Sequence, residues 1–425
     1  MSSTLILLGA LIILFPLFIS PSPSPSPSPC SSISPDEYGG VYRPNNGHHA
    51  GGGATVQATL QAGTWVDDYG AKGDGIADDT EAFRRAWSAA CSSEGGVFTV
   101  PSSGVYRLRQ ITFSGPCKSG FLVKIYGRII ASDDPSDYES DHSKWLTFEN
   151  LDNLSVEGGG SVDGNGMKWW SRSCKVNPSL ALKFYKCSNV RVTDLTLKDA
   201  QQMHLIFQDC ENVRATNLRI TAPASSPNTD GIHVTGTRNI LIDNCLIGTG
   251  DDCVSIVGGS KYVEVSNIRC GPGHGISIGS LGADNARDHV SEVYVHGAML
   301  WGTANGVRIK TWQGGSGYAK NIRFEDIGMI NVTNPIIIDQ NYCDRADPCH
   351  EERSAVQVSN VMYQNVIGTS ASEVAMKFDC SRSHPCREIS LQGIILRRSE
   401  GTKTAHASCA HVNFAGNAMV YPNCH

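Results

Sequence analysis

The chain has 425 residues, 18% of them charged, and its formal net charge is −6. A mildly acidic chain lacks the basic surface that nucleic-acid binding requires, so we expect no nucleic-acid partner. With 44 glycines, the composition fits an extracellular β-protein, and the length allows one long repetitive domain or two globular ones.

Residues 1–20 have the pattern of a secretory signal peptide. The stretch from Leu5 to Ile19 is almost purely apolar and small residues follow it, although residues 1–4 lack the usual positive charge. A retained membrane anchor is the alternative, but a run of this length that contains Pro16 is short for a bilayer span. We therefore expect a secreted protein without stable membrane association.

Residues 21–63 form a low-complexity tail in which proline alternates with serine, followed by a stretch rich in glycine, asparagine and histidine. Such a segment cannot bury a core, so we expect an extended tail. No linker interrupts the strand patterns that follow, and we expect residues 64–425 to form a single domain. Near its start, Asp78 to Trp87 predicts a short amphipathic helix with an acidic first turn.

A series of short strands, most of them alternating between apolar and polar residues, runs through the rest of the chain. Equivalent aliphatic residues recur every 23 to 39 positions in Asn189–Val192, Asn212–Ala215, Asn239–Ile242, Tyr262–Val265, Glu292–Val295, Asn321–Phe324, Asn360–Tyr363 and Glu388–Leu391. Repeats of this length without helical periodicity predict an all-β fold, a parallel β-helix, with the short N-terminal helix capping its open end. Leucine-rich repeats would need a leucine and asparagine ladder that is missing, and a sandwich of hairpins would not keep two strand series in phase.

A second strand series carries ionisable residues at a constant offset. Its first aliphatic residues include Ile232 and Val254, 22 positions apart, and Ile276 follows after a further 22. The residues two positions earlier are Asp230, Asp252 and His274, so a 22-residue coil would stack them. Val307, 31 positions after Ile276, begins a fourth member that brings Arg308 and Lys310 to the same register.

These residue types suit the cleavage of a glycosidic bond. That reaction needs a carboxylic acid to protonate the leaving oxygen and a carboxylate to activate water or attack carbon, and Asp251, Asp252 and Asp230 supply both. Mutual repulsion should raise the pKa of at least one of them, and His274 could orient or tune a neighbour. Alone, an Asp-Asp pair is usually a solvated turn and such a histidine a surface residue, so the argument depends on the stacking.

Arg308 and Lys310 lie two positions apart on a strand, and hence on one face, away from Val307 and Ile309. A basic pair on a strand is usually a solvated face. Beside an acid cluster, it instead indicates an anionic substrate, because a guanidinium binds a carboxylate bidentately. An acidic sugar polymer fits both the acids and the cations.

Strict alternation poses one difficulty, since it would place Asp230 in the core together with Ile232. A turn or bulge at Gly231, and at the equivalent Cys253 and Gly275, would release this constraint.

Fifteen cysteines in a secreted chain predict disulfides with one cysteine left over, for which Cys30 is the candidate. Three close pairs and one longer pair are expected: Cys343 with Cys349, Cys380 with Cys386, Cys409 with Cys424, and Cys253 with Cys270, which would rigidify the site. No Cys-x-x-Cys cluster indicates a metal site, and we expect no metal. Asn153 and Asn331 begin sequons for N-glycosylation.

Four motifs resemble those of the polygalacturonases of glycoside hydrolase family 28, especially the plant-type enzymes: Asn228-Thr229-Asp230, Gly250-Asp251-Asp252, Gly273-His274-Gly275 and Arg308-Ile309-Lys310. Tyr69-Gly70-Ala71-Lys72-Gly73-Asp74-Gly75 is similar as well, and the resemblance covers residues 64–425. It implies a right-handed parallel β-helix that hydrolyses α-1,4-linked galacturonan with inversion, without a cofactor. The resemblance also implies that the protein acts on pectin in cell-wall remodelling. We expect the protein to act as a monomer.

The resemblance also implies a role for each site residue. Asp251 takes the role of the proton donor, Asp230 and Asp252 hold the water, and His274 is the accessory histidine. Arg308 and Lys310 would bind a substrate carboxylate, and Asn228 and Tyr342 would contact substrate.

Two other functions remain open at this stage. One is a β-eliminating pectate lyase that binds Ca²⁺ through the aspartates and abstracts a proton with a basic residue. The other is a catalytically silent protein that binds the wall. The sequence does not distinguish endo from exo attack, nor does it set the tolerance of methyl esters.

Overall fold

The computed structural model describes residues 63–118, 120–138, 144–171, 182–345, 349–401 and 403–424. The expected signal peptide and nearly all of the expected tail lie outside these ranges. The described residues from 63 onward belong to one compact unit.

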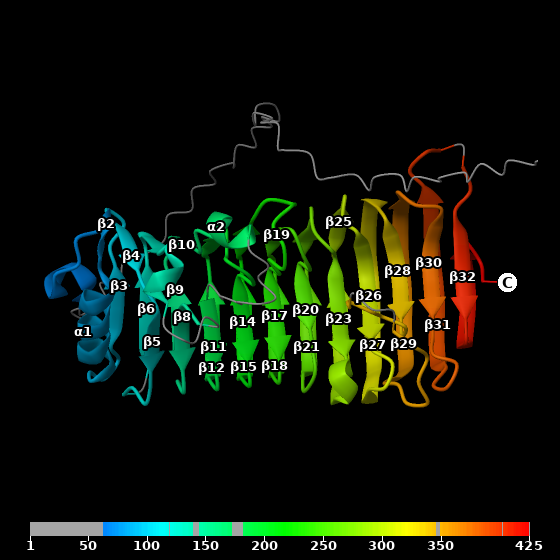
Figure 1. Ribbon diagram of the computed structural model, residues 1–425, viewed down its shortest axis with the longest axis horizontal. Helices are drawn as coiled ribbons and strands as arrows, with labels where there is room; N and C mark the ends of the chain where they lie inside the picture. The colour runs from blue at the N-terminus through cyan, green and yellow to red at the C-terminus, as the bar shows by residue number, and fades with distance from the viewer. Residues whose placement is uncertain are drawn as a thin grey trace, which may run out of the picture. The chain divides into compact units, whose positions relative to one another are not determined.

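Strands in parallel register build this unit, as the repeat predicted, and they stand side by side along its long axis (Figure 1). One sheet of eleven strands contains β5 (Ile111–Ser114), β8 (Leu146–Glu149), β11 (Leu182–Tyr185), β14 (Leu205–Gln208), β17 (Ile232–Thr235), β20 (Val254–Ile256), β23 (Ile276–Leu281), β26 (Asn305–Thr311), β28 (Asn334–Asp339), β30 (Val374–Asp379) and β32 (His406–Ala410).

The second sheet has 22 strands and forms the remaining walls of the coil. Its members are β1 (Thr64–Trp65), β2 (Asp74–Asp78), β3 (Val97–Val100), β4 (Val105–Leu108), β6 (Phe121–Ile125), β7 (Arg128–Ala131), β9 (Leu154–Glu157), β10 (Ser161–Asp163), β12 (Ser188–Thr193), β13 (Thr196–Lys198), β15 (Glu211–Thr216), β16 (Arg219–Thr221), β18 (Arg238–Asp243), β19 (Leu246–Gly248), β21 (Lys261–Ser266), β22 (Arg269–Cys270), β24 (Arg287–His296), β25 (Met299–Trp301), β27 (Ser316–Val332), β29 (Gln357–Ser370), β31 (Cys386–Arg398) and β33 (Val412–Tyr421).

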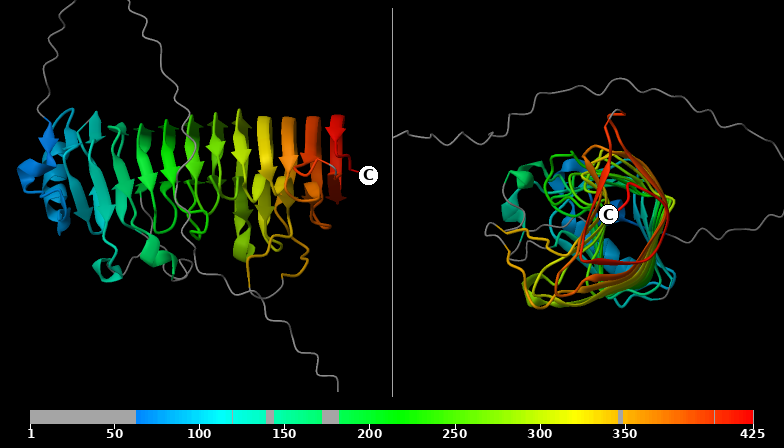
Figure 2. Two further views of the ribbon diagram at one scale, coloured as in Figure 1. Left: turned by 90° about the horizontal axis from the view of Figure 1, so that it is seen from above. Right: turned by 90° about the vertical axis from the view of Figure 1, so that its right-hand side faces the viewer.

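The two sheets wrap around one continuous apolar core, and the coil that they form is seen end-on in the right view of Figure 2. Each turn of the coil adds a strand to the first sheet and one or two to the second, which makes the fold the expected right-handed parallel β-helix. Aromatic rings stack along the core from turn to turn, with Phe184 5.1 Å from Phe148 and 5.2 Å from Phe207 between ring centroids. We call each turn of the coil a rung.

Helix α1 (Thr80–Cys91) covers the N-terminal end of the core, as expected, but it begins later and ends later than predicted. Asp79 accepts hydrogen bonds from the backbone of Lys72 and Gly73, which holds it in the preceding loop. Beyond Trp87 the helix continues because Ala90 is still buried. The other helical segments are short: α2 (Met167–Trp170) and the 3-10 turns η1 (Val66–Tyr69), η2 (Pro135–Asp137) and η3 (Ala283–Asn285).

A ladder of left-handed residues sets the register of the second sheet. The first residue of each of the eight predicted segments has a φ between 50° and 57°. Five of these residues are asparagines, which adopt this conformation at low cost and hydrogen-bond from rung to rung, as Asn212 does to Asn189 at 3.1 Å and Asn239 to Asn212 at 2.7 Å. Tyr262, Glu292 and Glu388 adopt the same left-handed conformation although their side chains do not favour it. The turn itself therefore requires a left-handed residue at this position.

The disulfides agree with all four predicted pairs, and a fifth joins Cys91 at the end of α1 to Cys117. The expectation of a single unpaired cysteine was wrong. Cys187, Cys210 and Cys245 are all free, because each is buried at a strand turn and packs as a small apolar side chain. Cys30 lies outside the described residues. The sequon residues Asn153 and Asn331 are both exposed.

We predict that Glu388→Asn stabilises the protein. A left-handed conformation costs a residue other than glycine, asparagine or aspartate about 1–2 kcal/mol, and asparagine would also continue the ladder from Asn360. The free energy of unfolding, measured by urea titration, should rise by about 1 kcal/mol. Glu388→Gln removes the same charge without the conformational advantage, so an equal gain in that control would contradict this explanation.

Candidate active site

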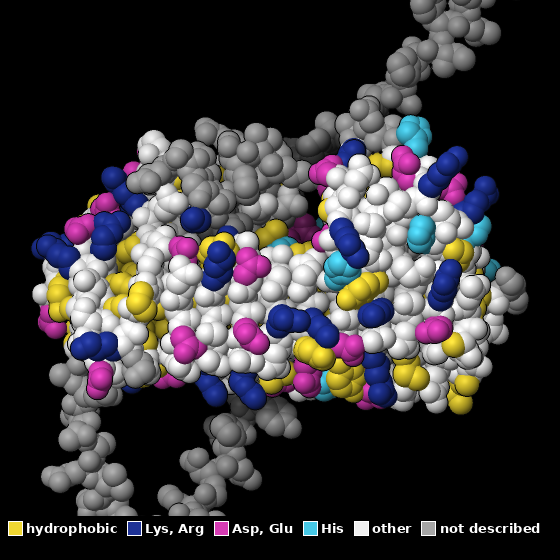
Figure 3. Space-filling model, turned by 90° about the horizontal axis from the view of Figure 1, so that it is seen from below, with side chains coloured by type: hydrophobic (Ala, Val, Ile, Leu, Met, Phe, Trp, Pro, Cys, Tyr) yellow, Lys and Arg dark blue, Asp and Glu magenta, His cyan; other side chains and the backbone are white. Residues whose placement is uncertain are grey.

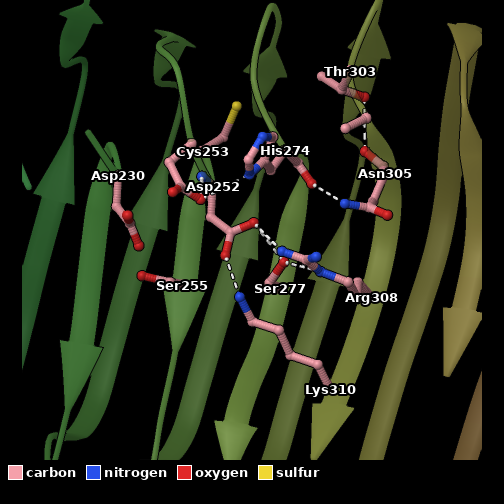
Figure 4. Close-up of polar contacts among 12 residues, drawn as sticks. Asp230, Asp252, Cys253, Ser255, His274, Ser277, Thr303, Asn305, Arg308 and Lys310 are labelled. Atoms are coloured by element: carbon pink, nitrogen blue, oxygen red, sulfur yellow. Dashed lines mark hydrogen bonds and ion pairs between the residues drawn. The ribbon is translucent and has the colours of Figure 1, made fainter. Parts of the chain in front are cut away.

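A groove of about 420 Å³ crosses the outer face of the first sheet, from the start of β14 to the loop after β28. It contains every candidate site residue from the sequence. Its lining is Met203, Asn228, Asp230, His233, Asp251, Asp252, Ser255, Val257, His274, Gly279, Ser280, Arg308, Lys310, Tyr342 and Asp344. Figure 4 shows part of this cluster on neighbouring strands.

The strand register that the 22-residue spacing predicted is present, because Ile232 pairs with Val254 and Val254 with Ile276. The alternation of side chains does not place Asp230 in the core. Ile232, Val254 and Ile276 are the first residues of their strands, so the acids lie in the loops before the strands, where the alternation does not apply. The backbone at Gly275 is left-handed (φ +88°). At Gly231 a Cβ atom would lie 2.5 Å from the Cys253 carbonyl oxygen, so a side chain does not fit there.

Asp252 is the most deeply buried acid of the site, and two cations neutralise it. Its Oδ1 accepts hydrogen bonds from Arg308 Nη2 at 2.8 Å and Ser277 Oγ at 2.7 Å, and its Oδ2 lies 3.1 Å from Lys310 Nζ (Figure 4). Removing one partner of such a buried pair typically costs about 3–5 kcal/mol, because the other charge is left uncompensated. Arg308 and Lys310 therefore stabilise the site as well as facing the groove.

Both cations keep donors that can bind a substrate anion. A guanidinium has five N–H groups and an ammonium three. Arg308 gives one to Asp252 and one, through Nε at 3.0 Å, to Ser277, while Lys310 gives one to Asp252. The expected contact with a substrate carboxylate is thus compatible with the internal bonds.

Asp251 is held by His274, which lies one rung further along. His274 Nδ1 is 2.9 Å from Asp251 Oδ1, and the amide of Asn228 donates to Oδ2 at 3.3 Å. Burial raises the pKa of Asp251, but the hydrogen bond and charge of His274, together with Lys310, outweigh burial and leave the pKa below its ordinary value. The same hydrogen bond raises the pKa of His274, against the opposing effect of burial.

Asp230 is the acid whose pKa is raised. Burial is the main cause, the charges of Asp251 and Asp252 add to it, and His233 opposes it. From the sequence we expected that mutual repulsion would raise the pKa of at least one acid of the cluster. Desolvation is the larger effect here.

Tyr342, in the loop after β28, closes one side of the groove. Lys310 Nζ lies 5.4 Å from the centre of the Tyr342 ring, within the range of a cation–π contact. The rings of Tyr342 and Trp312 are nearly perpendicular, with their centroids 5.4 Å apart. Burial raises the pKa of Tyr342 to about 12, so the phenol keeps its proton and can donate a hydrogen bond to a ligand.

Sequence reasoning missed three polar residues that support the acids. His233 Nδ1 lies 3.8 Å from an Asp230 carboxylate oxygen and 2.7 Å from Ser255 Oγ. His204 is fully buried and bonds the Asp230 carbonyl through its ring at 3.1 Å, and burial lowers its pKa to about 4. Periodicity could have found His233 and Ser255, which are the outward residues of β17 and β20, but nothing local marks His204.

A metal ion is poorly suited to this cluster. Ligand atoms of Asp251, Asp252 and His274 lie within 4.8 Å of one another. The carboxylate of Asp252, however, already receives two cationic partners, and Asp251 and His274 satisfy each other. A divalent cation would have to displace Arg308 and Lys310, so the geometry disfavours the Ca²⁺ site that a lyase would need.

Comparison with known proteins identifies the family. The sequence profile described as "Glycosyl hydrolases family 28" matches residues 91–419. The chain belongs to this family. It is 56% identical over 368 residues to "Polygalacturonase QRT2" of Arabidopsis thaliana, which covers 84% of this chain and 83% of that protein. It is 58% identical over 355 residues to "Polygalacturonase" of Persea americana, covering 82% and 76%.

Among solved structures, the endo-xylogalacturonan hydrolase of Aspergillus tubingensis aligns with a TM-score of 0.71 at 24% identity, covering 82% of this chain and 98% of that one. At this identity the alignment supports the fold alone. In the part of the chain that the structure describes, no helix is long and apolar enough to span a membrane.

We predict that Asp251→Asn lowers the pKa of His274. The carboxylate stabilises the imidazolium, so the pKa of His274 should fall toward the ordinary value of about 6.5 when the charge is removed. Titration of the imidazole signals by NMR measures this. Glu264→Gln, a loss of charge on the second sheet, should leave the titration of His274 unchanged, and a shift of equal size there would show that the effect is nonspecific.

Proposed function

We propose that this chain is a polygalacturonase that hydrolyses α-1,4-galacturonosyl linkages of pectin by an inverting acid/base mechanism. The observation that carries the proposal is the convergence of three carboxylates, a histidine and two cations in one groove. The acids suit glycosidic cleavage, the cations suit an acidic sugar, and the similarity to polygalacturonases supports both.

Asp251 donates a proton to the leaving oxygen, and Asp230 and Asp252 hold the attacking water. Arg308 and Lys310 fix the position of the Asp252 carboxylate, whose oxygens can accept hydrogen bonds from water. His274 stabilises the charge that Asp251 acquires once it has given up its proton. Arg308 and Lys310, with Asn228 and Tyr342, position the sugar.

The lowered pKa of Asp251 appears at odds with proton donation, and the pair that it forms with His274 resolves the difficulty. With one proton on the pair, the main form is a carboxylate beside an imidazolium. The minor form, with the proton on Asp251, is the one that reacts. The pair therefore keeps its proton up to the raised pKa of His274, well above the range of an isolated aspartic acid.

We place the enzyme outside the cell, acting on pectin in cell-wall remodelling. Five disulfides suit an oxidising compartment, and the apolar stretch from Leu5 to Ile19 suits a signal peptide. All the expected site residues lie in one groove of this chain, which supports a monomer as the active form. The two exposed sequons are candidate glycosylation sites.

Activity on polygalacturonate tests the proposal. We expect new reducing ends without the ultraviolet absorbance of an unsaturated product, and a product whose initial anomeric form, followed by NMR, is inverted. Asp251→Asn should lower kcat by about 10²–10⁴-fold at similar substrate affinity, because an amide cannot donate the proton. More than a tenth of the activity remaining would move the donor role to another acid. An unsaturated product would indicate a lyase, and no product at all would indicate a silent binding protein.

The pH profile tests the roles of Asp230 and His274. Asp230 must be ionised, so activity is lost as pH falls through its raised pKa, and it is lost again as pH rises through the raised pKa of His274. Activity should therefore be highest between these two pKa values and decline once the pH rises above the ordinary imidazole range of about 6.5. His274→Gln should shift the alkaline limb to lower pH, because Asp251 must then hold the proton alone. An unchanged alkaline limb in that variant would contradict the paired-proton explanation.

A further inference from the structure

A second groove lies on the outer face of the second sheet, and it shares no lining residue with the groove of the active site. It has a volume of about 660 Å³ and follows the coil over β9, β12, β15, β18, β21 and β24, which pair in that order. Neighbouring strands are about 4.8 Å apart, so this second-sheet groove extends for about 24 Å along the axis. Its length suits a segment of an extended polymer.

Two arginines lie side by side near the start of the second-sheet groove. Arg191 of β12 is in register with Arg214 of β15, and both are exposed. The next residues in the same row are Ser155 on one side and Leu241 on the other, which carry no charge. Among the residues that the structure describes, no acid lies within ion-pair distance of either guanidinium. Like charges opposite each other on neighbouring strands are destabilising, so an anion that contacts both arginines would relieve their repulsion.

The asparagine ladder lines the groove beside the arginines. Asn189, Asn212 and Asn239 all belong to the lining, and all three are exposed. A side-chain amide has two N–H donors, and Asn212 and Asn239 each give one to the preceding asparagine, which leaves the second for a ligand. Hydroxyl groups accept such bonds. The ladder therefore offers a row of donors to a chain of sugars.

Tyr262 continues the ladder with an aromatic ring. Its φ of 57° is a conformation that is costly for a residue other than glycine, asparagine or aspartate. The ring is 54% exposed, so burial in the core does not offset this cost. Packing therefore does not explain the tyrosine. An exposed aromatic ring can instead pack against the apolar face of a sugar ring, and it adds its large contact area to the groove.

The opposite end of the second-sheet groove is acidic. Glu264 lies two rungs beyond Arg214, 3.1 Å from His296 Nε2, and Glu292 accepts a hydrogen bond from the Asn321 side chain at 2.6 Å. A polymer with a charge on every face would be repelled there. An acidic sugar chain also carries hydroxyl groups, which can donate to carboxylates. Such a chain fits both ends, with carboxylates at the arginines and hydroxyls at the acids.

We propose that the second-sheet groove is a non-catalytic binding site for galacturonan. Arg191 and Arg214 bind the carboxylates of ionised units, and Tyr262 packs against a sugar ring. The choice of galacturonan as the ligand rests on the proposed polygalacturonase function. A second contact with the same polymer keeps the enzyme close to its substrate, because it raises the effective concentration of cleavable linkages at the other groove.

Binding to immobilised polygalacturonate tests the arginines, in an Asp251→Asn background that prevents cleavage. Arg191→Gln combined with Arg214→Gln should raise Kd by about tenfold, because exposed charge pairs are individually weak. The control combines Arg219→Gln with Arg238→Gln, which removes two exposed charges of the same sheet that do not line the groove. The same Kd in both double variants would overturn the proposal.

Methyl esterification tests the contact from the side of the ligand. On a fully esterified polymer the two double variants should bind equally, since no carboxylate remains for Arg191 and Arg214. A difference that persists on this polymer would contradict carboxylate recognition and overturn the proposal.

Tyr262→Asn separates binding from stability. Asparagine suits the left-handed turn, so urea titration should show a protein at least as stable as wild type. The loss of the ring should nevertheless raise Kd for polygalacturonate several-fold. Tyr262→Phe keeps the ring and should keep the wild-type Kd. Wild-type binding by the asparagine variant would overturn the role given to the ring.

Asn153, which begins one of the sequons, lies on the first rung of the second-sheet groove. A glycan there would reach the ligand, so Kd is measured on the secreted protein and again after an endoglycosidase has removed N-glycans. A loss of binding specific to the arginine variant in either form supports the proposal. Its absence from both forms overturns it.

Kinetics distinguish this site from the proposed function. Trigalacturonate occupies one groove at a time, so its kcat/KM should be the same for the wild type and for the variant that lacks Arg191 and Arg214. On the polymer, kcat/KM should fall in that variant alone. If the wild-type protein cleaves neither substrate, the polygalacturonase proposal fails, and Kd still decides the second site. If it cleaves both and the arginine variant binds like its control, only the second site fails.

Discussion

In-register pairing of parallel strands is the constraint on which the rest of this protein depends. The coil brings residues that are 22 positions apart in sequence to one strand spacing in space, and it repeats this along a continuous apolar core. The reacting groups need no long loops to meet, because the three aspartates and His274 each lie two or three residues before a strand, and Arg308 and Lys310 lie on β26. The left-handed turn at the start of the opposite strands fixes this register, and asparagine ladders hold it.

Electrostatics divides the acids of the site. Asp252 is buried with two cations, Asp251 is held by His274, and Asp230 is left with burial and two nearby charges. Asp251 and Asp230, chemically identical side chains on neighbouring rungs, thereby acquire pKa values shifted in opposite directions. On the face shown in Figure 3, acidic and basic side chains are interspersed, without the concentration of acids and cations that the groove has.

Most of this arrangement was predictable from the sequence, because it follows from periodicity. The register of β17, β20 and β23 was expected from Ile232, Val254 and Ile276, and four disulfides from short spacing or from the position of Cys253. The ion pairs of Asp252 reach 56 and 58 residues along the chain, and no local pattern marks them. The link between Cys91 and Cys117 and the free buried thiols depend on packing between turns, which spacing alone does not reveal.

The contacts of Asp252 also bear on how the coil opens. A solenoid in which each rung contacts only its neighbours can fray from its ends, one rung at a time. Asp252 in the rung of β20 bonds to Arg308 and Lys310 in the rung of β26, and so spans the rung of β23 between them. These three rungs consequently open together or not at all. The terminal rungs can fluctuate independently, while the groove behaves as a single cooperative unit whose local unfolding is coupled to the loss of a buried charge pair.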